Sequence, residues 1–143
     1  MIFARDFNLK AYEQNGLPFL GRAYKLVPGT GKVAIVQADI TSITRTVKRF
    51  STVNGAFGNI TTPQSAVNVP VATAIFDTLK TDSAWNADTI GYNFADTIPA
   101  AAFPGLGAYS AVYTFTPAGT NFSVFPLILR INVVSLESTL AEG

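Results

Sequence analysis

The chain has 143 residues and a formal net charge of +1, with no histidine, no cysteine and only nine carboxylates. Those side chains supply most general bases, covalent nucleophiles and metal ligands, so the composition argues against an enzyme and indicates no cofactor or metal. The weak net charge gives no long-range field for a polyanion, which argues against nucleic acid as a partner.

Residues 1–19 show no periodicity and end at the turn signal Asn15-Gly16-Leu17-Pro18. They are interpreted as an extended N-terminal arm that precedes a single domain over residues 20–143. The arm is apolar at Phe3, Phe7 and Tyr12, so it should lie on a surface of its own domain or of a neighbour, and the neighbour is favoured. No apolar run fits a signal peptide or a membrane span, so synthesis in the cytoplasm and no contact with a membrane are expected.

The middle of the chain is typical of strands separated by turns. A strand is expected over residues 21–27, ended by Pro28-Gly29-Thr30-Gly31, and a long strand region rich in Val, Ile and Thr over 33–50. Asn54-Gly55 and Gly58-Asn59 indicate a loop. A short strand over 66–71 contains Pro70, which favours the edge of a sheet.

Residues 73–80 are the one segment with a helical pattern, with Thr73 as its N-cap. An extended segment then runs from Gly91 to Pro99. Two strong strands follow over 108–116 and 122–135, and each alternates between an apolar face and a more polar face. The whole pattern predicts an all-β chain, an antiparallel immunoglobulin-like β-sandwich with one short helix and the extended N-terminal arm.

Few residues suggest a binding site. Trp85 and Tyr92, with Phe94, are candidates for an aromatic platform that stacks on a sugar, although core packing is the favoured interpretation of Trp85 and Phe94. Four aspartates, Asp77, Asp82, Asp88 and Asp96, allow a calcium site, but their spacing fits no calcium-binding loop and turn formation is favoured. The basic residues Arg45, Lys48 and Arg49 are interpreted as a solvated strand end rather than a phosphate contact.

Residues 76–116 carry a resemblance to a known group of proteins. It rests on Phe-Asp-Thr-Leu-Lys-Thr-Asp at 76–82, then Trp85, Gly-Tyr-Asn-Phe at 91–94, Pro99, and Tyr-Ser-Ala-Val-Tyr-Thr-Phe-Thr-Pro at 109–117. In this order the segment resembles small phage virion structural proteins with an immunoglobulin-like domain, of the tail, baseplate or head-associated type. The resemblance extends over residues 33–135 and implies a virion component without catalytic residues.

Composition points the same way. Charged residues form 13% of the chain, about half the usual proportion, and a weakly charged surface is easier to bury between subunits than a charged one. The alternative explanation of this composition is a small monomer with a neutral polar surface. The resulting hypothesis is a phage tail, neck, baseplate or capsid-associated protein, whose partners are other virion proteins and further copies of itself. The alternative is a carbohydrate-binding or adhesin module, with a glycan as its ligand.

Candidate contact residues are therefore few. The hypothesis of an interface or ligand platform names Phe3, Phe7, Tyr12, Trp85 and Tyr92.

Overall fold

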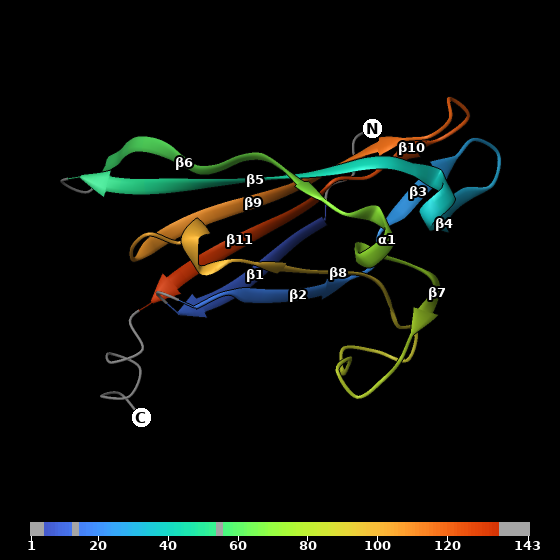
Figure 1. The fold of residues 1–143 in the computed structure, drawn as a ribbon, viewed down its shortest axis with the longest axis horizontal. Helices are drawn as coiled ribbons and strands as arrows, with labels where there is room; N and C mark the ends of the chain where they lie inside the picture. The colour runs from blue at the N-terminus through green and yellow to red at the C-terminus, as the bar shows by residue number, and fades with distance from the viewer. Residues whose placement is uncertain (1–4, 13–14, 54–55, 135–143) are drawn as a thin grey trace.

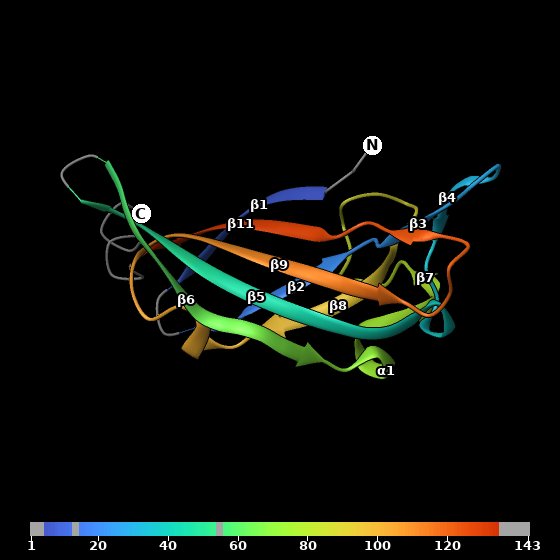
Figure 2. The same ribbon diagram turned by 90° about the horizontal axis from the view of Figure 1, so that it is seen from above.

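The computed structural model describes residues 5–12, 15–53 and 56–134 (Figure 1). Its largest sheet has the strand order β1-β11-β9-β5-β6, with β1 (Arg5–Tyr12), β5 (Ile40–Val53), β6 (Ala56–Val69), β9 (Gly107–Pro117) and β11 (Leu127–Val134). Figure 2 shows these strands side by side, with β2 and β8 behind β5 and β9. The predicted all-β sandwich is confirmed.

Two smaller sheets complete the described part of the chain. The order β2-β8-β7 joins β2 (Leu17–Gly21), β8 (Tyr92–Ile98) and β7 (Ile75–Lys80), and the order β10-β3-β4 joins β10 (Ser123–Val124), β3 (Tyr24–Val27) and β4 (Gly31–Ala34). Among the described residues, three short helical turns lie between strands: η1 (Gln37–Asp39), α1 (Val71–Ala74) and η2 (Ala100–Ala102).

The core lies between the five-stranded sheet and the β2-β8-β7 sheet. The alternation predicted for the two C-terminal strands is confirmed, because one set of side chains is buried: Tyr109, Ala111, Tyr113 and Phe115 on β9, and Leu127, Leu129, Ile131 and Val133 on β11. Phe94 of β8 packs edge-on against Tyr113, with ring centroids 4.9 Å apart. Phe94 is fully buried, which confirms its predicted place in the core.

The expected N-terminal arm is largely part of its own domain. Residues 5–12 form β1, which pairs in parallel with β11 from Arg5↔Leu127 to Tyr12↔Val134. Residues 17–21 form β2, which pairs with β8. Backbone pairing and the burial of Ala11 anchor this segment, so it lies on its own sheet rather than on a neighbour. The parallel pair also departs from the wholly antiparallel sheet that was expected.

The helix expected over residues 73–80 is wrong. The helical turn α1 ends at Ala74, and residues 75–80 form β7. Thr73 does not cap the helix, because its hydroxyl donates to the carbonyl oxygen of Pro70 at 3.3 Å. The β-branched and aromatic side chains of residues 75–78 favour a strand, and pairing of Ile75 with Phe94 in β8 overrides the weak helical pattern.

Two strand boundaries also differ from the sequence interpretation. The long strand expected over 33–50 is interrupted by η1, where the backbone N–H of Val36 donates to the Asp39 carboxylate at 3.0 Å. The loop expected at Gly58-Asn59 lies within β6, while Asn54-Gly55 falls outside the described residues. The edge position expected for residues 66–71 is confirmed, because β6 is the last strand of its sheet, but this strand is longer than expected and ends at Val69, so Pro70 and Val71 lie outside it.

A buried polar cluster joins the two main sheets. Arg45 of β5 is 5% exposed, and its guanidinium donates to the Asp96 carboxylate of β8. Tyr113 of β9 donates its hydroxyl to the same carboxylate at 2.6 Å, and Gln64 of β6 accepts from Arg45 Nε at 2.9 Å. Burial, followed by the hydrogen bond to Asp96, raises the pKa of Tyr113 well above its ordinary value. The phenol therefore remains a donor in the cluster.

Replacing Arg45 should destabilise the fold strongly. Arg45→Leu is expected to lower the free energy of unfolding by about 3–5 kcal/mol, because it leaves the Asp96 carboxylate poorly solvated and without its cation. Urea unfolding measures the change. Lys48→Leu is the matched control on the same strand, since Lys48 is exposed, and it should change the free energy by less than about 0.5 kcal/mol. Equal losses in the two variants would contradict a special role of the cluster.

Candidate functional site

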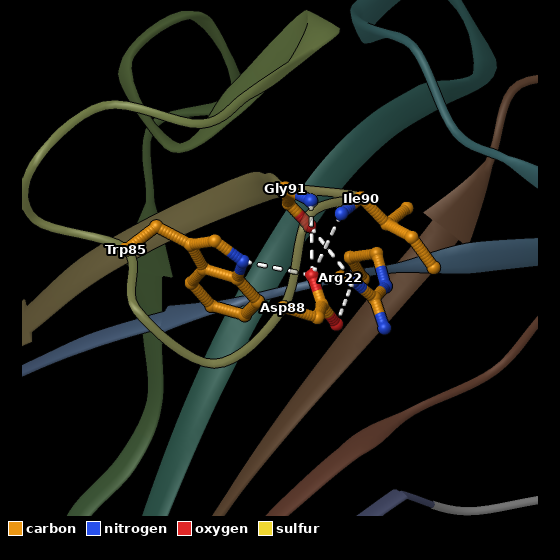
Figure 3. A network of polar contacts seen from close by, with 5 residues as sticks. All are labelled: Arg22, Trp85, Asp88, Ile90 and Gly91. Carbon is orange, nitrogen blue, oxygen red and sulfur yellow. Dashed lines mark hydrogen bonds and ion pairs between the residues drawn. The ribbon is translucent and has the colours of Figure 1, made fainter.

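The first candidate site is the loop of residues 81–91 between β7 and β8, which contains Trp85 (Figure 3). The indole N–H of Trp85 donates to Asp88 Oδ1 at 2.9 Å. The Trp85 ring lies 5.6 Å from the ring of Tyr92 and 5.8 Å from the guanidinium carbon of Arg22. Trp85 is half-buried, so the loop itself covers part of the indole.

Asp88 is the centre of this loop. Its Oδ1 also accepts from the backbone N–H groups of Ile90 and Gly91, at 3.0 and 3.1 Å, and its Oδ2 accepts from Arg22 Nη1 at 2.6 Å (Figure 3). The hydrogen bond from Trp85, followed by that from Arg22, holds the pKa of Asp88 far below its usual range. The carboxylate therefore stays ionised and fastens the loop to the turn between β2 and β3.

Gly91 allows the chain to pass from this loop into β8. Its φ of +105° lies in the region that side chains rarely adopt, and a Cβ atom there would stand 2.6 Å from the carbonyl oxygen of Lys80. Arg22 Nη1 donates to the Gly91 carbonyl oxygen at 3.0 Å. The close approach of β7 and β8 therefore depends on this glycine.

Tyr92 is buried, with 6% of its surface exposed. Its hydroxyl donates to Asp82 at 2.8 Å, and its ring meets Phe76 edge-on at 5.7 Å. The structure thus brings Trp85 and Tyr92 together, as the hypothesis of an aromatic platform required. However, Tyr92 packs inside the loop, so only the half-buried ring of Trp85 is accessible for stacking on a sugar.

The other residues named as an interface lie elsewhere. Tyr12 is half-buried at the end of β1, which lies at the opposite end of the molecule from the Trp85 loop (Figure 1). Phe7 belongs to β1, but its side chain is outside the described residues, as is the whole of Phe3. Tyr12, Trp85 and Tyr92 therefore do not form one site.

The four aspartates considered for calcium are engaged separately. Within the described part of the chain, no group of three or more acidic residues is arranged to hold a metal ion. Each aspartate accepts hydrogen bonds from its own surroundings, with partners on Gln37 for Asp77, Tyr92 for Asp82, Trp85 for Asp88 and Arg45 for Asp96. These contacts fit the structural roles favoured by the sequence.

The basic residues of β5 point to different faces of the sheet. Arg45 is buried, and Arg49 is half-buried and donates to the carbonyl oxygen of Leu106 at 2.7 Å. Lys48 lies on the opposite face and is exposed. The interpretation of all three as a solvated strand end is therefore wrong for Arg45 and Arg49, because the period of two directs them inward.

The second candidate site is the outer face of the five-stranded sheet, which is the face turned away from β2 and β8. No described element lies over β5 and β9 on this side (Figure 2). The face contains a hollow of about 540 Å³ lined by Leu9, Phe50, Ala108, Tyr109, Ser110, Ile128, Arg130, Ile131 and Asn132. A neighbouring hollow of about 450 Å³ is lined by Thr46, Lys48, Phe50, Ser110, Val112 and Thr114.

The two hollows share Phe50 and Ser110, so they form one continuous region of the outer face. Each contains one cation, Arg130 in the larger hollow and Lys48 in the smaller. The remaining lining is apolar or carries hydroxyl and amide groups. Such a surface is suited to binding through side-chain packing.

Sequence reasoning did not identify this face. The outward positions of β9 and β11 were read as the polar side of each strand, although Val112 and Ile128 are apolar and half-buried there. These apolar residues at outward positions were the available signal. Their position next to Phe50 of β5 depends on strand order, which one sequence does not provide.

Comparison of the chain with models of protein families, and with curated proteins, finds no match. The described residues contain no helix with the length and apolar character needed to cross a bilayer.

The Trp85 loop should depend on pH through Asp88. Its pKa is lower in the folded than in the unfolded chain, so its stabilising effect is full above the unfolded value of about 4 and is lost as the pH falls through the folded value. Asp88→Asn should lower the melting temperature at pH 7 and make it fall less between pH 4 and pH 2. Calorimetry across this range measures both effects.

Thr89→Ala, at an exposed position in the same loop, is the control and should keep the parent profile. Trp85→Phe should reproduce part of the Asp88→Asn effect, because it removes the indole donor and keeps an aromatic ring. An acid profile unchanged by Asp88→Asn would contradict the role assigned to this carboxylate.

Proposed function

We propose that this chain is a non-enzymatic structural subunit that acts through protein–protein assembly, in the tail, neck or baseplate of a phage particle or bound to its capsid. The observation that carries the proposal is the outer face of the five-stranded sheet. That face has two connected hollows, whose lining residues include two charged side chains, Lys48 and Arg130, and it has no described element of the chain over β5 and β9. Its partners are other virion proteins and further copies of the chain.

The outer face is well suited to a contact between subunits. Its backbone groups are largely paired within the sheet, so a partner can bury the surface without leaving many amides unsatisfied. Serine and threonine hydroxyls are solvated before assembly and cost less to desolvate than charged groups. Half-buried Val112, Ile128 and Phe50 add apolar area that favours association.

Assignment to a phage particle rests on the sequence. Residues 76–116 carry the resemblance to small phage structural proteins, and the low content of charged residues agrees with a subunit whose surface is covered in a particle. Several side chains within residues 76–116 have structural roles. Trp85 and Asp88 fasten a loop, while Phe94 and Tyr113 fill the core.

Association through the outer face can be tested by light scattering after size exclusion. The full chain is expected to elute as an oligomer, and Val112→Glu is expected to elute as a monomer, because it places a carboxylate in the smaller hollow. Leu79→Glu is the matched control, since Leu79 is an exposed apolar residue on β7 in the other sheet, and it should keep the parent mass. Circular dichroism checks that each variant is folded.

Location in a particle needs a separate measurement. Mass spectrometry of purified phage particles should detect the chain at a constant ratio to the major structural proteins. Its absence from the particles would contradict the virion assignment, and an oligomer unaffected by Val112→Glu would contradict assembly through the outer face.

A further inference from the structure

We propose that β1 is an edge to which a second copy of the chain adds its own β1, antiparallel and about a two-fold axis at Asn8. The inference rests on the proposed function as an assembling subunit, and it names a second contact that is separate from the outer face. It combines the position and regularity of β1, the geometry of pairing between identical strands, and the charges along this strand.

Strand β1 is a free edge of the main sheet. It is the first strand in the order β1-β11-β9-β5-β6, and among the described residues it pairs only with β11. Figure 2 shows β1 at the outside of the sheet, with no described strand beyond it. An edge strand presents backbone N–H and C=O groups on its open side, so it is a template for a further strand.

The edge at β1 is regular, unlike the other edge of the same sheet. All the residues from Arg5 to Tyr12 pair with β11 without a register shift, and none of them is proline or glycine. The opposite edge, β6, has three register shifts against β5. Within the described part of this sheet, β1 is therefore the edge that a partner strand can follow over its full length.

Pairing geometry limits how two copies of β1 can meet. The N–H and C=O groups of successive residues point to opposite sides of a strand, so only every second residue of β1 can bond a new strand. Two identical antiparallel strands therefore have a residue, and never a peptide bond, on their two-fold axis. Within β1, an axis through Asn8 pairs residues 5–11, and an axis through Leu9 pairs residues 6–12.

Charge selects the axis through Asn8. In that register the position of Asp6 is opposite Lys10 of the second copy, and the symmetry forms this pair twice. The axis through Leu9 would instead place Lys10 opposite Asn8, which is neutral. Opposite charges at facing positions stabilise a pair of strands.

Lys10 is available for such a pair. It is exposed, and it forms no ion pair with another described residue. The side chains of residues 5–8 lie outside the described part of the chain, so the match with Asp6 is one of register and sequence. Charged residues on an edge discourage unrelated strands, but in this register they favour a second copy.

The arrangement enlarges the surface on which the proposed function depends. A two-fold axis perpendicular to the sheet keeps the residues that face outward in one copy on the same side in the other. Two five-stranded sheets thus become one continuous sheet, and their outer faces lie side by side. A partner then meets two adjoining sets of hollows.

Edge pairing is the weaker of the two contacts. Seven residues form a strip about 24 Å long and about 5 Å wide, which is a small fraction of the roughly 800 Å² that each partner buries in a standard interface. In dilute solution this contact alone should not hold two copies together, so Val112→Glu should still elute as a monomer. Within an oligomer held by the outer face, the high local concentration favours edge pairing.

Single cysteines test the register, because the chain has no cysteine of its own. At the axis, the Cα atoms of the two copies of position 8 should lie about 4.5–5.5 Å apart, within the range of a disulfide bond. The oligomer of Asn8→Cys, treated with diamide, should form a covalent dimer on a non-reducing gel. Lys10→Cys alone should not, since its two copies are four residues out of register and about 14 Å apart.

A mixture of two variants identifies the facing positions. Position 6 of one copy faces position 10 of the other, so Asp6→Cys mixed with Lys10→Cys should form a covalent dimer. Asp6→Cys alone should remain monomeric on the gel. Equal cross-linking of Asn8→Cys and of Lys10→Cys alone would contradict the register and overturn the inference.

The second test reverses the charges and measures the initial rate of cross-linking through Asn8→Cys. Asp6→Lys or Lys10→Asp places like charges opposite each other at two positions, and each should lower the rate about tenfold. The double variant restores opposite charges with their places exchanged, and it should recover the rate of the parent. Lys80→Asp, at an exposed position of β7 in the other sheet, is the control and should leave the rate unchanged.

Cross-linking through Asn8→Cys that follows the charges supports edge pairing. Absence of the covalent dimer in a chain that elutes as an oligomer would overturn this inference and leave the proposed assembly through the outer face intact. Specific cross-linking in an oligomer that Val112→Glu does not change would support pairing of β1 and contradict the outer face. A chain that is monomeric at all concentrations and does not cross-link would overturn both contacts, and its detection in purified particles would then still support the virion assignment.

Discussion

The contact between Arg45 and Asp96 is the constraint on which the two faces of the main sheet depend. It joins β5 to β8, and the Tyr113 hydroxyl from β9 shares the same carboxylate. With Arg45 fixed inward, the period of two directs Lys48 and Phe50 outward. A slip of one residue would place Arg45 on the outer face and the outward residues in the core, at a large energetic cost. The buried ion pair therefore determines what the outer face presents.

A second group of polar contacts holds the smaller elements against this core. Asn93 of β8 is buried, accepts from the backbone N–H of Ala23 at 2.7 Å and donates to the carbonyl oxygens of Ala23 and Ile35. One side chain thus joins the residues next to β3 and β4 to the central strand of its own sheet. Asp88 performs a similar role for the Trp85 loop. Because Asn93 and Asp88 act away from the outer face, changes on that face should leave the remaining packing intact.

Sequence alone could identify elements whose pattern is local. Alternation in β9 and β11 predicted their buried faces, and the edge position expected for residues 66–71 holds for β6, although Pro70 itself follows the strand and is the N-cap residue of α1. Contacts between distant residues were not accessible. Residues 75–80 had a weak helical pattern that pairing with β8 overrides, and Arg45 seemed solvated because its partner Asp96 is 51 residues away. The hollows of the outer face were missed for the same reason, since they combine residues from different strands.

The edge strand β6 is a poor template for strand addition, which agrees with the proposed contact through the outer face. Pairing of β6 with β5 has three register shifts, and Ala66 has a φ of +47°, so the strand is irregular. Pro63 lacks a backbone donor and further weakens this edge as a template for another chain. The strands that form the outer face are paired more regularly, since β9 pairs with β11 without a register shift. The proposed association therefore relies on side chains of the outer face rather than on strand addition at β6.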